Sequence, residues 1–149
     1  MKCLFVKAPW AGWIVDGVKV YEYRTRETYI RGRIGIIESG TGTVIGDAIL
    51  TDCRRNQELG CYEWTMRQAR RYATPVPFEH KQGAITWIEL EYDPEAQELA
   101  PNLSSYRRRV EAIAYRKASA EYFAKLKYPT KDPDKPTTRT KEAAYGMMS

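Results

Sequence analysis

The sequence predicts a small α+β protein with one folded domain. Its 149 residues are 43% hydrophobic, which is enough to bury one sizeable core but leaves little for a second. Short runs rich in β-branched and aromatic residues alternate with turn residues over the first hundred positions, and a long segment of helical periodicity follows. We therefore expect a domain over residues 1–100, a C-terminal helix over 101–128 and a tail over 129–149.

The first expected elements are a strand and a short helix. The apolar run at residues 3–6 suits a buried strand, and Pro9 suits the first turn of a helix because its missing N–H is not needed there. Trp10 and Trp13 fall on one face of this helix, and Gly17 lies where a left-handed C-terminal cap is expected. For Trp13, as for Trp64, we expect a place in the core.

Three further strands are expected before residue 54. Residues 18–25 alternate in character and are rich in β-branched and aromatic side chains. Residues 33–39 and 43–53 have the same composition, and the Gly40-Thr41-Gly42 turn between them predicts a hairpin.

Residues 59–73 are expected to form a helix. Tyr62, Met66, Ala69 and Ala73 follow a 3.6-residue spacing, and Pro75 ends the segment. The basic side chains that this helix would turn outward, and that we expect to contact phosphates, are Arg67, Arg70 and Arg71. Residues 84–92 then alternate as a last strand does.

A long amphipathic helix is expected from Ser104 or Ser105 to about Lys127, followed by a basic tail that is disordered in isolation because of its prolines. The apolar stripe expected to dock this helix on the domain consists of Tyr106, Val110, Ile113 and Ala120. Arg109 and Arg116 flank the stripe as further candidates for phosphate contacts.

The positive charge is concentrated in the C-terminal third. Residues 1–103 hold 13 Lys and Arg against 14 Asp and Glu, whereas residues 104–149 hold 11 against 5. This distribution predicts a polyanionic partner. The alternatives are a solvated tail that keeps the protein soluble, or a protein-interaction adaptor in which the long helix binds a partner.

Several classes of function are excluded or disfavoured. The three cysteines, Cys3, Cys53 and Cys61, are accompanied by one histidine, so we expect no disulfide framework, no metal site, no cysteine protease and no cofactor. There is no apolar run near the roughly 18 residues of a membrane span. Charge interrupts the amino end too soon for a secretory signal, so we expect a soluble, cytoplasmic protein with no membrane partner.

The strongest candidate site lies in residues 17–24. Lys19, Glu22 and Arg24 place a cation, an acceptor and a bidentate donor within one short stretch, which suits the edge of a base. A regular strand would send Lys19 and Glu22 to opposite faces, so a shared pocket requires Lys19 to lie in the turn before the strand or beside a bulge. The alternative is a surface lysine beside a Glu22–Arg24 ion pair.

These residues form a G-x-K-x-x-E-x-R motif and, with residues 33–39 and the G-x-x-x-W element at 83–87, resemble the ASCH family of PUA-like β-barrels. The resemblance covers residues 2–92. It implies a small PUA-like barrel with short covering helices and a surface cleft. The residues that it places around the cleft as nucleobase or RNA contacts are Trp10, Lys19, Glu22, Arg24, Ser39, Gly83 and Trp87.

The resemblance implies nucleic-acid binding, with single-stranded RNA or a modified nucleoside as the partner. The alternative is an ASCH-type enzyme, either a metal-independent ribonuclease or an amidohydrolase for N-acylated cytidine-like nucleosides, with Lys19 and Glu22 as catalytic residues. Two departures weigh against the amidohydrolase, because Val20 replaces a common threonine and the fourth position of the Lys-x-x-Thr arrangement is Glu22. The base recognised and the oligomeric state stay open.

Overall fold

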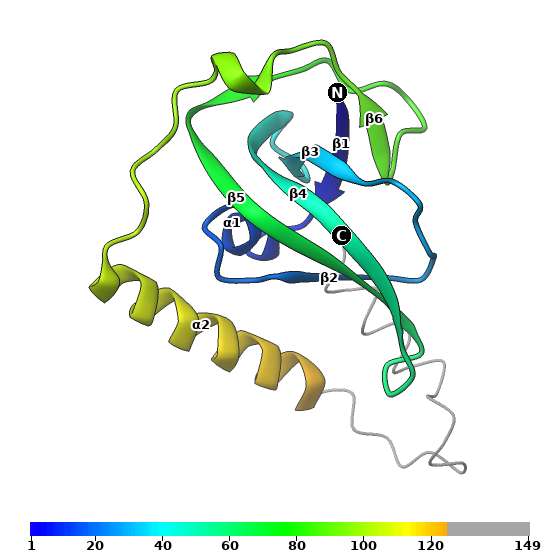
Figure 1. Ribbon diagram of the computed structural model, residues 1–149, viewed down its shortest axis with the longest axis vertical. Coiled ribbons are helices and arrows are strands. Elements are labelled where there is room, and N and C mark those ends of the chain that lie inside the picture. The colour runs from blue at the N-terminus through cyan, green and yellow to red at the C-terminus, as the bar shows by residue number, and fades with distance from the viewer. Residues whose placement is uncertain (125–149) are drawn as a thin grey trace.

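Six strands and two helices make up the part of the chain described by the computed structural model, residues 1–124. The elements in chain order are β1 (Lys2–Val6), α1 (Trp10–Val15), β2 (Tyr21–Arg24), β3 (Gly32–Glu38), β4 (Thr43–Asn56), β5 (Cys61–Pro77), β6 (Trp87–Glu89), a 3-10 turn (Pro94–Ala96) and α2 (Ser105–Ala124) (Figure 1). The expected first strand, first helix and β3–β4 hairpin are confirmed, with bounds that shift by a few residues.

The strands form one mixed sheet in the order β2-β5-β4-β3-β1-β6. β1 runs parallel to β3, and the other neighbours are antiparallel. The edge strands β2 and β6 are not hydrogen-bonded to each other, so the expected closed barrel is wrong. A side-chain contact connects the two ends of the curled sheet instead. The ring of Trp64 on β5 stacks on the ring of Trp87 on β6, with ring centroids 5.7 Å apart.

β5 replaces the helix expected over residues 59–73. This strand pairs with β4 along almost its whole length, and the register shifts at three places. At one of them Gln68 has a φ of 48°, a left-handed conformation that accommodates an extra residue in the strand. An extra residue in a strand interrupts the alternation of side chains between the two faces. The apolar residues of β5 therefore have a spacing that resembles that of a helix.

The sheet has apolar side chains on both faces. Alternate residues of β1 point in opposite directions, so Leu4 and Val6 join the larger core with α1, while Cys3 and Phe5 join a smaller one. Gly46 lets α1 approach β4, because a Cβ there would overlap the Arg70 carbonyl and lie 2.7 Å from a Val15 methyl carbon. The larger core therefore lies on one face of the sheet and the smaller core on the other.

α2 lies along one side of the sheet and is reached through an extended segment (Figure 1). Its inner face packs Tyr115 and Tyr122 against Trp10, with ring centroids 6.2 and 6.1 Å away. The Trp13 indole donates a 3.0 Å hydrogen bond to Glu111 Oε2.

The apolar stripe expected to dock α2 is on the wrong side of the helix. Tyr106, Val110 and Ile113 are 67%, 40% and 59% exposed, and Ala120 is exposed as well. The aromatic residues of α1 favour docking through the face of α2 that carries Tyr115. The rings of Trp10 and Trp13 provide a large contact area for the Tyr115 ring. The expected end of this helix at Lys127 and the expected tail lie outside the described residues.

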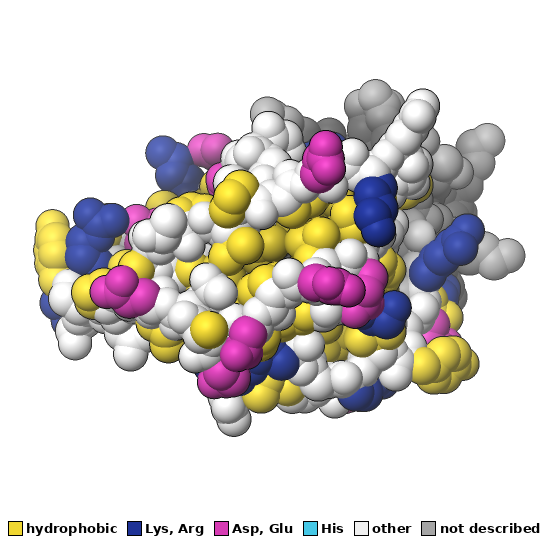
Figure 2. All heavy atoms as spheres, turned by 90° about the horizontal axis from the view of Figure 1, so that it is seen from above, with side chains coloured by type: hydrophobic (Ala, Val, Ile, Leu, Met, Phe, Trp, Pro, Cys, Tyr) yellow, Lys and Arg dark blue, Asp and Glu magenta, His cyan; other side chains and the backbone are white. Residues whose placement is uncertain are grey.

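The surface mixes apolar and charged side chains. Seen from above, hydrophobic side chains gather in the middle of one face, with acidic and basic side chains around them (Figure 2). Neither α1 nor α2, the helices within residues 1–124, combines the length and the apolar character needed to cross a membrane.

Candidate functional site

The turn before β2 brings the predicted cation and carboxylate to the same side. α1 ends at Val15, Gly17 then has a φ of 74°, and the backbone N–H groups of Val18 and Lys19 both donate to the Trp13 carbonyl. β2 begins only at Tyr21, so Lys19 precedes the strand and escapes its alternation. The condition set by the sequence for a shared pocket is met.

Lys19, Glu22 and Arg24 form one buried cluster, which we call the Lys–Glu–Arg cluster. Glu22 Oε1 lies 3.5 Å from Lys19 Nζ, and Glu22 Oε2 accepts a 2.9 Å hydrogen bond from Arg24 Nη2. Lys19 also donates to the Tyr21 carbonyl, and Arg24 Nη2 to the Phe5 carbonyl at 2.6 Å. Lys19 is 1% exposed and Glu22 is fully buried, so the alternative of a surface lysine is wrong.

The cluster retains unused hydrogen-bonding capacity. Among the described residues, Glu22 Oε1 and Arg24 Nε find no hydrogen-bond partner. Buried polar atoms of this kind are rare in folded proteins, and a ligand that supplies a partner removes the cost. One acceptor, which is ion-paired with Lys19, and one donor therefore lack a hydrogen bond on neighbouring side chains.

Burial also controls the protonation of the cluster. Desolvation lowers the pKa of Lys19 and raises the pKa of Glu22, and the attraction between the two groups opposes both changes. Each group is thereby brought closer to neutrality than it would be in water.

Aromatic rings surround the cluster. Arg24 lies 5.8 Å from the ring centre of Trp64, which stacks on the half-buried Trp87, and Lys19 Nζ lies 4.7 Å from that of Tyr23. Trp10, expected beside the cleft, is 6% exposed beneath α2. Trp13 and Trp64 belong to the core, as expected.

Ser39 and Gly83 lie apart from the cluster. Ser39 follows β3 and lines a pocket with Phe5 and Phe78, which belong to the smaller core on the other face of the sheet. Gly83 lies in the exposed loop before β6. The structure therefore divides the residues that the resemblance groups into one cleft.

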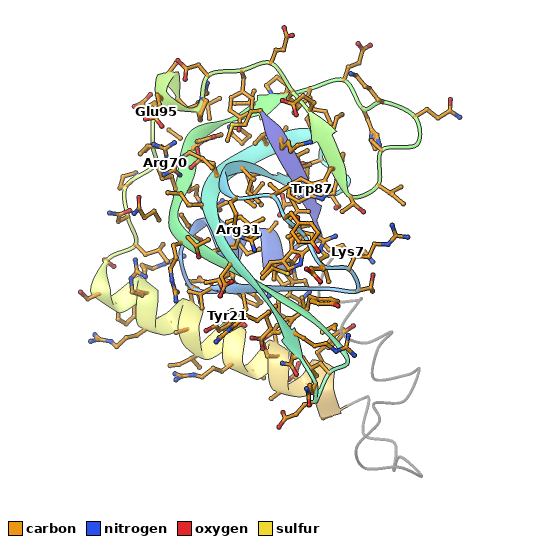
Figure 3. The ribbon with its side chains drawn as sticks, turned by 45° about the vertical axis from the view of Figure 1, so that its right-hand side comes forward. Lys7, Tyr21, Arg31, Arg70, Trp87 and Glu95 are labelled. Atoms are coloured by element: carbon orange, nitrogen blue, oxygen red, sulfur yellow. The ribbon has the colours of Figure 1, made fainter. Side chains whose placement is uncertain are left out.

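The predicted phosphate contacts divide into two groups. Arg70 donates to both oxygens of Asp47 and to Glu95, and Arg71 pairs with Asp16 at 2.7 Å. In Figure 3 Arg70 lies beside Glu95, well away from Tyr21 at the start of β2. The remaining three, which are exposed to solvent, are Arg67, Arg109 and Arg116.

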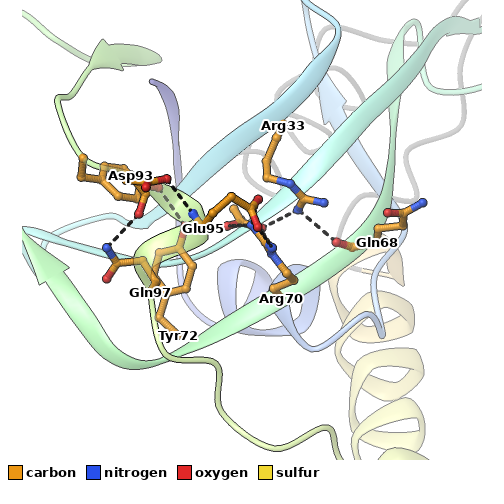
Figure 4. A network of polar contacts seen from close by, with 9 residues as sticks. Arg33, Gln68, Arg70, Tyr72, Asp93, Glu95 and Gln97 are labelled. Carbon is orange, nitrogen blue, oxygen red and sulfur yellow. Dashed lines mark hydrogen bonds and ion pairs between the residues drawn. The ribbon is translucent and has the colours of Figure 1, made fainter.

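Asp47 is the centre of a polar network that sequence reasoning missed. Figure 4 shows Arg33, Arg70 and Tyr72, which belong to this network. The fully buried carboxylate of Asp47 accepts hydrogen bonds from Arg33 at 2.6 Å, from Arg70, and from the Tyr72 hydroxyl at 2.6 Å. The available signal was an aspartate in the middle of the apolar run 44–50. A charge at such a position requires partners.

Tyr115 was also missed as a neighbour of the cluster. Its ring packs edge-on against Trp13, and burial followed by the nearby Glu22 charge is among the causes that raise its pKa. Within residues 1–124, no three His, Cys, Asp or Glu side chains are grouped as a metal site would require.

Comparison with known proteins gives a family and a fold. A model of the ASCH domain matches residues 4–127. A crystal structure of a Ser-to-Ala mutant of ASCH from Zymomonas mobilis is 14% identical, with a TM-score of 0.50 over 76% of this chain and 94% of that one. The unmutated protein is also 14% identical, with a TM-score of 0.44 over 76% and 93%. No curated protein matched.

Proposed function

Because this chain belongs to the ASCH family, we propose that it binds single-stranded RNA or a modified nucleoside through the Lys–Glu–Arg cluster. The observation that carries the proposal is a pair of buried atoms without a hydrogen bond, Glu22 Oε1, which is ion-paired with Lys19, and Arg24 Nε. A base edge offers an N–H donor beside a carbonyl or ring-nitrogen acceptor, which are the partners that these two atoms lack.

Each member of the cluster has a distinct role in this proposal. Glu22 accepts from an exocyclic amine or a ring N–H, and Arg24 donates to the adjacent acceptor. Lys19 binds a carbonyl or a phosphate. Trp87, which is half-buried and already stacked on Trp64, offers a ring on which a base can stack.

Ligand entry requires the cluster to open, because its side chains are at most 9% exposed. α2 is the element best suited to move. It docks through side-chain contacts of Tyr115, Tyr122 and Glu111 with α1. The exposed arginines of α2, Arg109 and Arg116, and Arg67 on β5 are the side chains that we expect to bind the phosphates of the strand.

RNA is favoured over DNA in this proposal. A pocket that holds one base needs a base that is already accessible, as in single-stranded RNA. A DNA duplex would first have to release a base from its stack, at a cost of a few kcal/mol.

The second candidate is an enzyme that cleaves RNA or hydrolyses a modified nucleoside. It is favoured by the directions of the two pKa shifts, since a lowered pKa at Lys19 and a raised pKa at Glu22 suit a general base and a general acid near neutral pH. In this case Lys19 and Glu22 are the catalytic residues.

The deciding experiment incubates the purified full chain with single-stranded RNA and with a panel of acylated and alkylated nucleosides. Products are analysed by mass spectrometry, and retention is measured by fluorescence anisotropy. The variants are Glu22→Gln, which keeps the size of the side chain, and Lys19→Met, which removes the charge without leaving a cavity. Circular dichroism shows that each variant is folded.

We expect the native chain to bind RNA or a nucleoside without converting it to a product. The affinity should fall at least tenfold in both folded variants. Turnover that disappears in Lys19→Met would establish the enzyme instead. The binding proposal fails if folded Glu22→Gln and the native chain retain every ligand equally well.

A further inference from the structure

A pocket lies on the opposite face of the sheet from the Lys–Glu–Arg cluster. Its volume is about 460 Å³, within the range of small-molecule sites. The residues that line it come from the end of β1, the end of β3 with the following turn, and the segment between β5 and β6: Phe5, Lys7, Ile37, Ser39, Gly40, Gly42, Phe78, His80, Ala84 and Ile85.

Three rings provide the pocket with an aromatic wall. The Phe5 ring centre lies 5.2 Å from that of His80 and 6.1 Å from that of Phe78. His80 Nε2 is 3.1 Å from the Ala84 carbonyl, which fixes the orientation of the imidazole. The Ile85 side chain at the rim is 80% exposed. Flat, fixed rings beside an open apolar rim suit a planar aromatic ligand.

The polar groups of the pocket favour a negative charge on that ligand. Its polar side chains are Lys7, Ser39 and His80, and no carboxylate is among the residues that line it. Within residues 1–124, Lys7 is exposed and takes part in no ion pair, so its ammonium is available to a phosphate. The Ser39 hydroxyl can donate a further hydrogen bond.

We propose that this pocket binds a nucleotide, with the base against Phe5, Phe78 and His80 and the phosphate at Lys7. The site is separate from the Lys–Glu–Arg cluster and does not depend on the function proposed for it. The Phe5 side chain lines this pocket and belongs to the smaller core, whereas Trp64, which lies against Arg24 of the cluster, belongs to the larger core. The two sites therefore lie on opposite faces of the sheet.

The test uses the single histidine of the chain as a probe. The NMR signals of the His80 ring are followed in the full chain during titration with AMP, with adenosine, with inorganic phosphate and with a tetra-adenylate RNA. We expect AMP to shift these signals saturably, and adenosine and phosphate alone to bind at least about tenfold more weakly. Tetra-adenylate distinguishes the source of the nucleotide. If it binds more tightly than AMP, the ligand is an RNA strand; if the two bind equally, the ligand is a free nucleotide.

Matched variants locate the contacts. Lys7→Gln should weaken AMP about tenfold and leave adenosine unchanged. Lys81→Gln removes the same charge from a nearby exposed residue outside the pocket and should leave both unchanged. Phe78→Leu should weaken AMP and adenosine alike.

The proposal is overturned by any of three results: no saturable shift with AMP or the oligonucleotide, equal losses in Lys7→Gln and Lys81→Gln, or loss of AMP binding in Glu22→Gln. The last result would place the nucleotide in the Lys–Glu–Arg cluster. Conversely, failure of the cluster to bind RNA leaves the His80 titration unaffected, so the two proposals fail separately.

Discussion

At the scale of single residues, buried charges distinguish the two faces of the sheet. Glu22 forms ion pairs with Lys19 and Arg24 but keeps one oxygen without a hydrogen bond, whereas Asp47 uses both carboxylate oxygens on Arg33, Arg70 and Tyr72. A fully partnered network supports the fold, and a partly partnered one leaves capacity for a ligand. This difference is the reason to assign binding to Glu22 and structure to Asp47.

Asp47→Asn should reduce the free energy of unfolding by about 3–5 kcal/mol, because it leaves the partly buried Arg33 guanidinium without its counter-charge and Arg70 with the exposed Glu95 alone. Urea denaturation measures the change. Asp52→Asn is the control, since Asp52 is more than half exposed and should change stability by less than about 0.5 kcal/mol. Equal losses in the two variants would contradict a structural role for the network.

The cysteines should differ in reactivity. Burial raises the pKa of Cys3 and of Cys61 to about 11, whereas Cys53 is half-buried. Iodoacetamide at a pH of about 8 should therefore alkylate Cys53 first. Mass spectrometry identifies the modified residue, and urea should remove the protection of the other two. Rapid alkylation of Cys61 in the folded chain would contradict its burial.

The same thiols make stability depend on pH. In the unfolded chain they ionise near a pKa of 9.0, and in the folded chain near about 11, so the unfolded state loses protons first. Their contribution to the free energy of unfolding is therefore complete below pH 9 and is lost as the pH rises toward 11. Cys61→Ala should make this decrease smaller.

At the scale of elements, the bulged β5 and the docked α2 determine which side chains meet. β5 carries Trp64 to the cluster and Arg70 to Asp47, and α2 covers Trp10 and the neighbourhood of Glu22. Both arrangements depend on partners that are distant in the sequence. Each can be tested by changing a residue that fixes the element.

Gln68→Gly should stabilise the protein by roughly 0.5–1 kcal/mol, because glycine adopts a φ of 48° without the steric cost that a side chain incurs. Thermal or urea unfolding measures the change. Gln57→Gly is the matched control, because Gln57 is exposed and does not have a positive φ, so glycine there should stabilise nothing. Destabilisation by Gln68→Gly would contradict a left-handed conformation at residue 68.

Glu111→Ala should loosen α2, since it removes the acceptor of the Trp13 indole. Hydrogen exchange of the α2 amides should become roughly tenfold faster. Glu121→Ala removes the same charge from an exposed position on the same helix and should leave exchange unchanged. If α2 covers the cluster as proposed, Glu111→Ala alone should also speed ligand binding; equal rates in the two variants would mean that the cluster opens by another route.

At the scale of the whole molecule, the exposed positive charges belong to more than one element. Arg67 lies on β5 and Arg109 and Arg116 on α2, whereas Arg70 and Arg71 are held by carboxylates. Among the predicted arginines, only the exposed ones are free to exchange solvent for phosphate.

RNA affinity should therefore decrease steeply with salt. For single strands each phosphate contact contributes about 0.7 to the slope of log K against log salt, so Arg109→Gln should reduce the slope by about that amount. Filter binding from low to high salt measures it. Arg71→Gln should instead lower stability, because it leaves Asp16 without its partner, and should leave the slope unchanged. An unchanged slope in Arg109→Gln would remove α2 from the RNA interface.

The sequence by itself determined the local features of this protein. An apolar run indicated β1, and β-branched residues around a glycine turn indicated the β3–β4 hairpin. Glycine at a left-handed position marked the end of α1, and the spacing of Lys19, Glu22 and Arg24 indicated the cluster and its family. These signals depend on neighbouring residues, so they can be read along the chain.

The tertiary structure alone decided what depends on distant partners. Bulges moved the apolar positions of β5 out of alternation, stacked tryptophans took the place of a closing strand pair, and the rings of α1 chose the inner face of α2. Ser39 lies apart from Lys19, in the pocket beside Phe5 and Ile37, whose side chains belong to the smaller core on the other face of the sheet. Such choices depend on which surfaces pack most closely, and that is a property of the assembled chain.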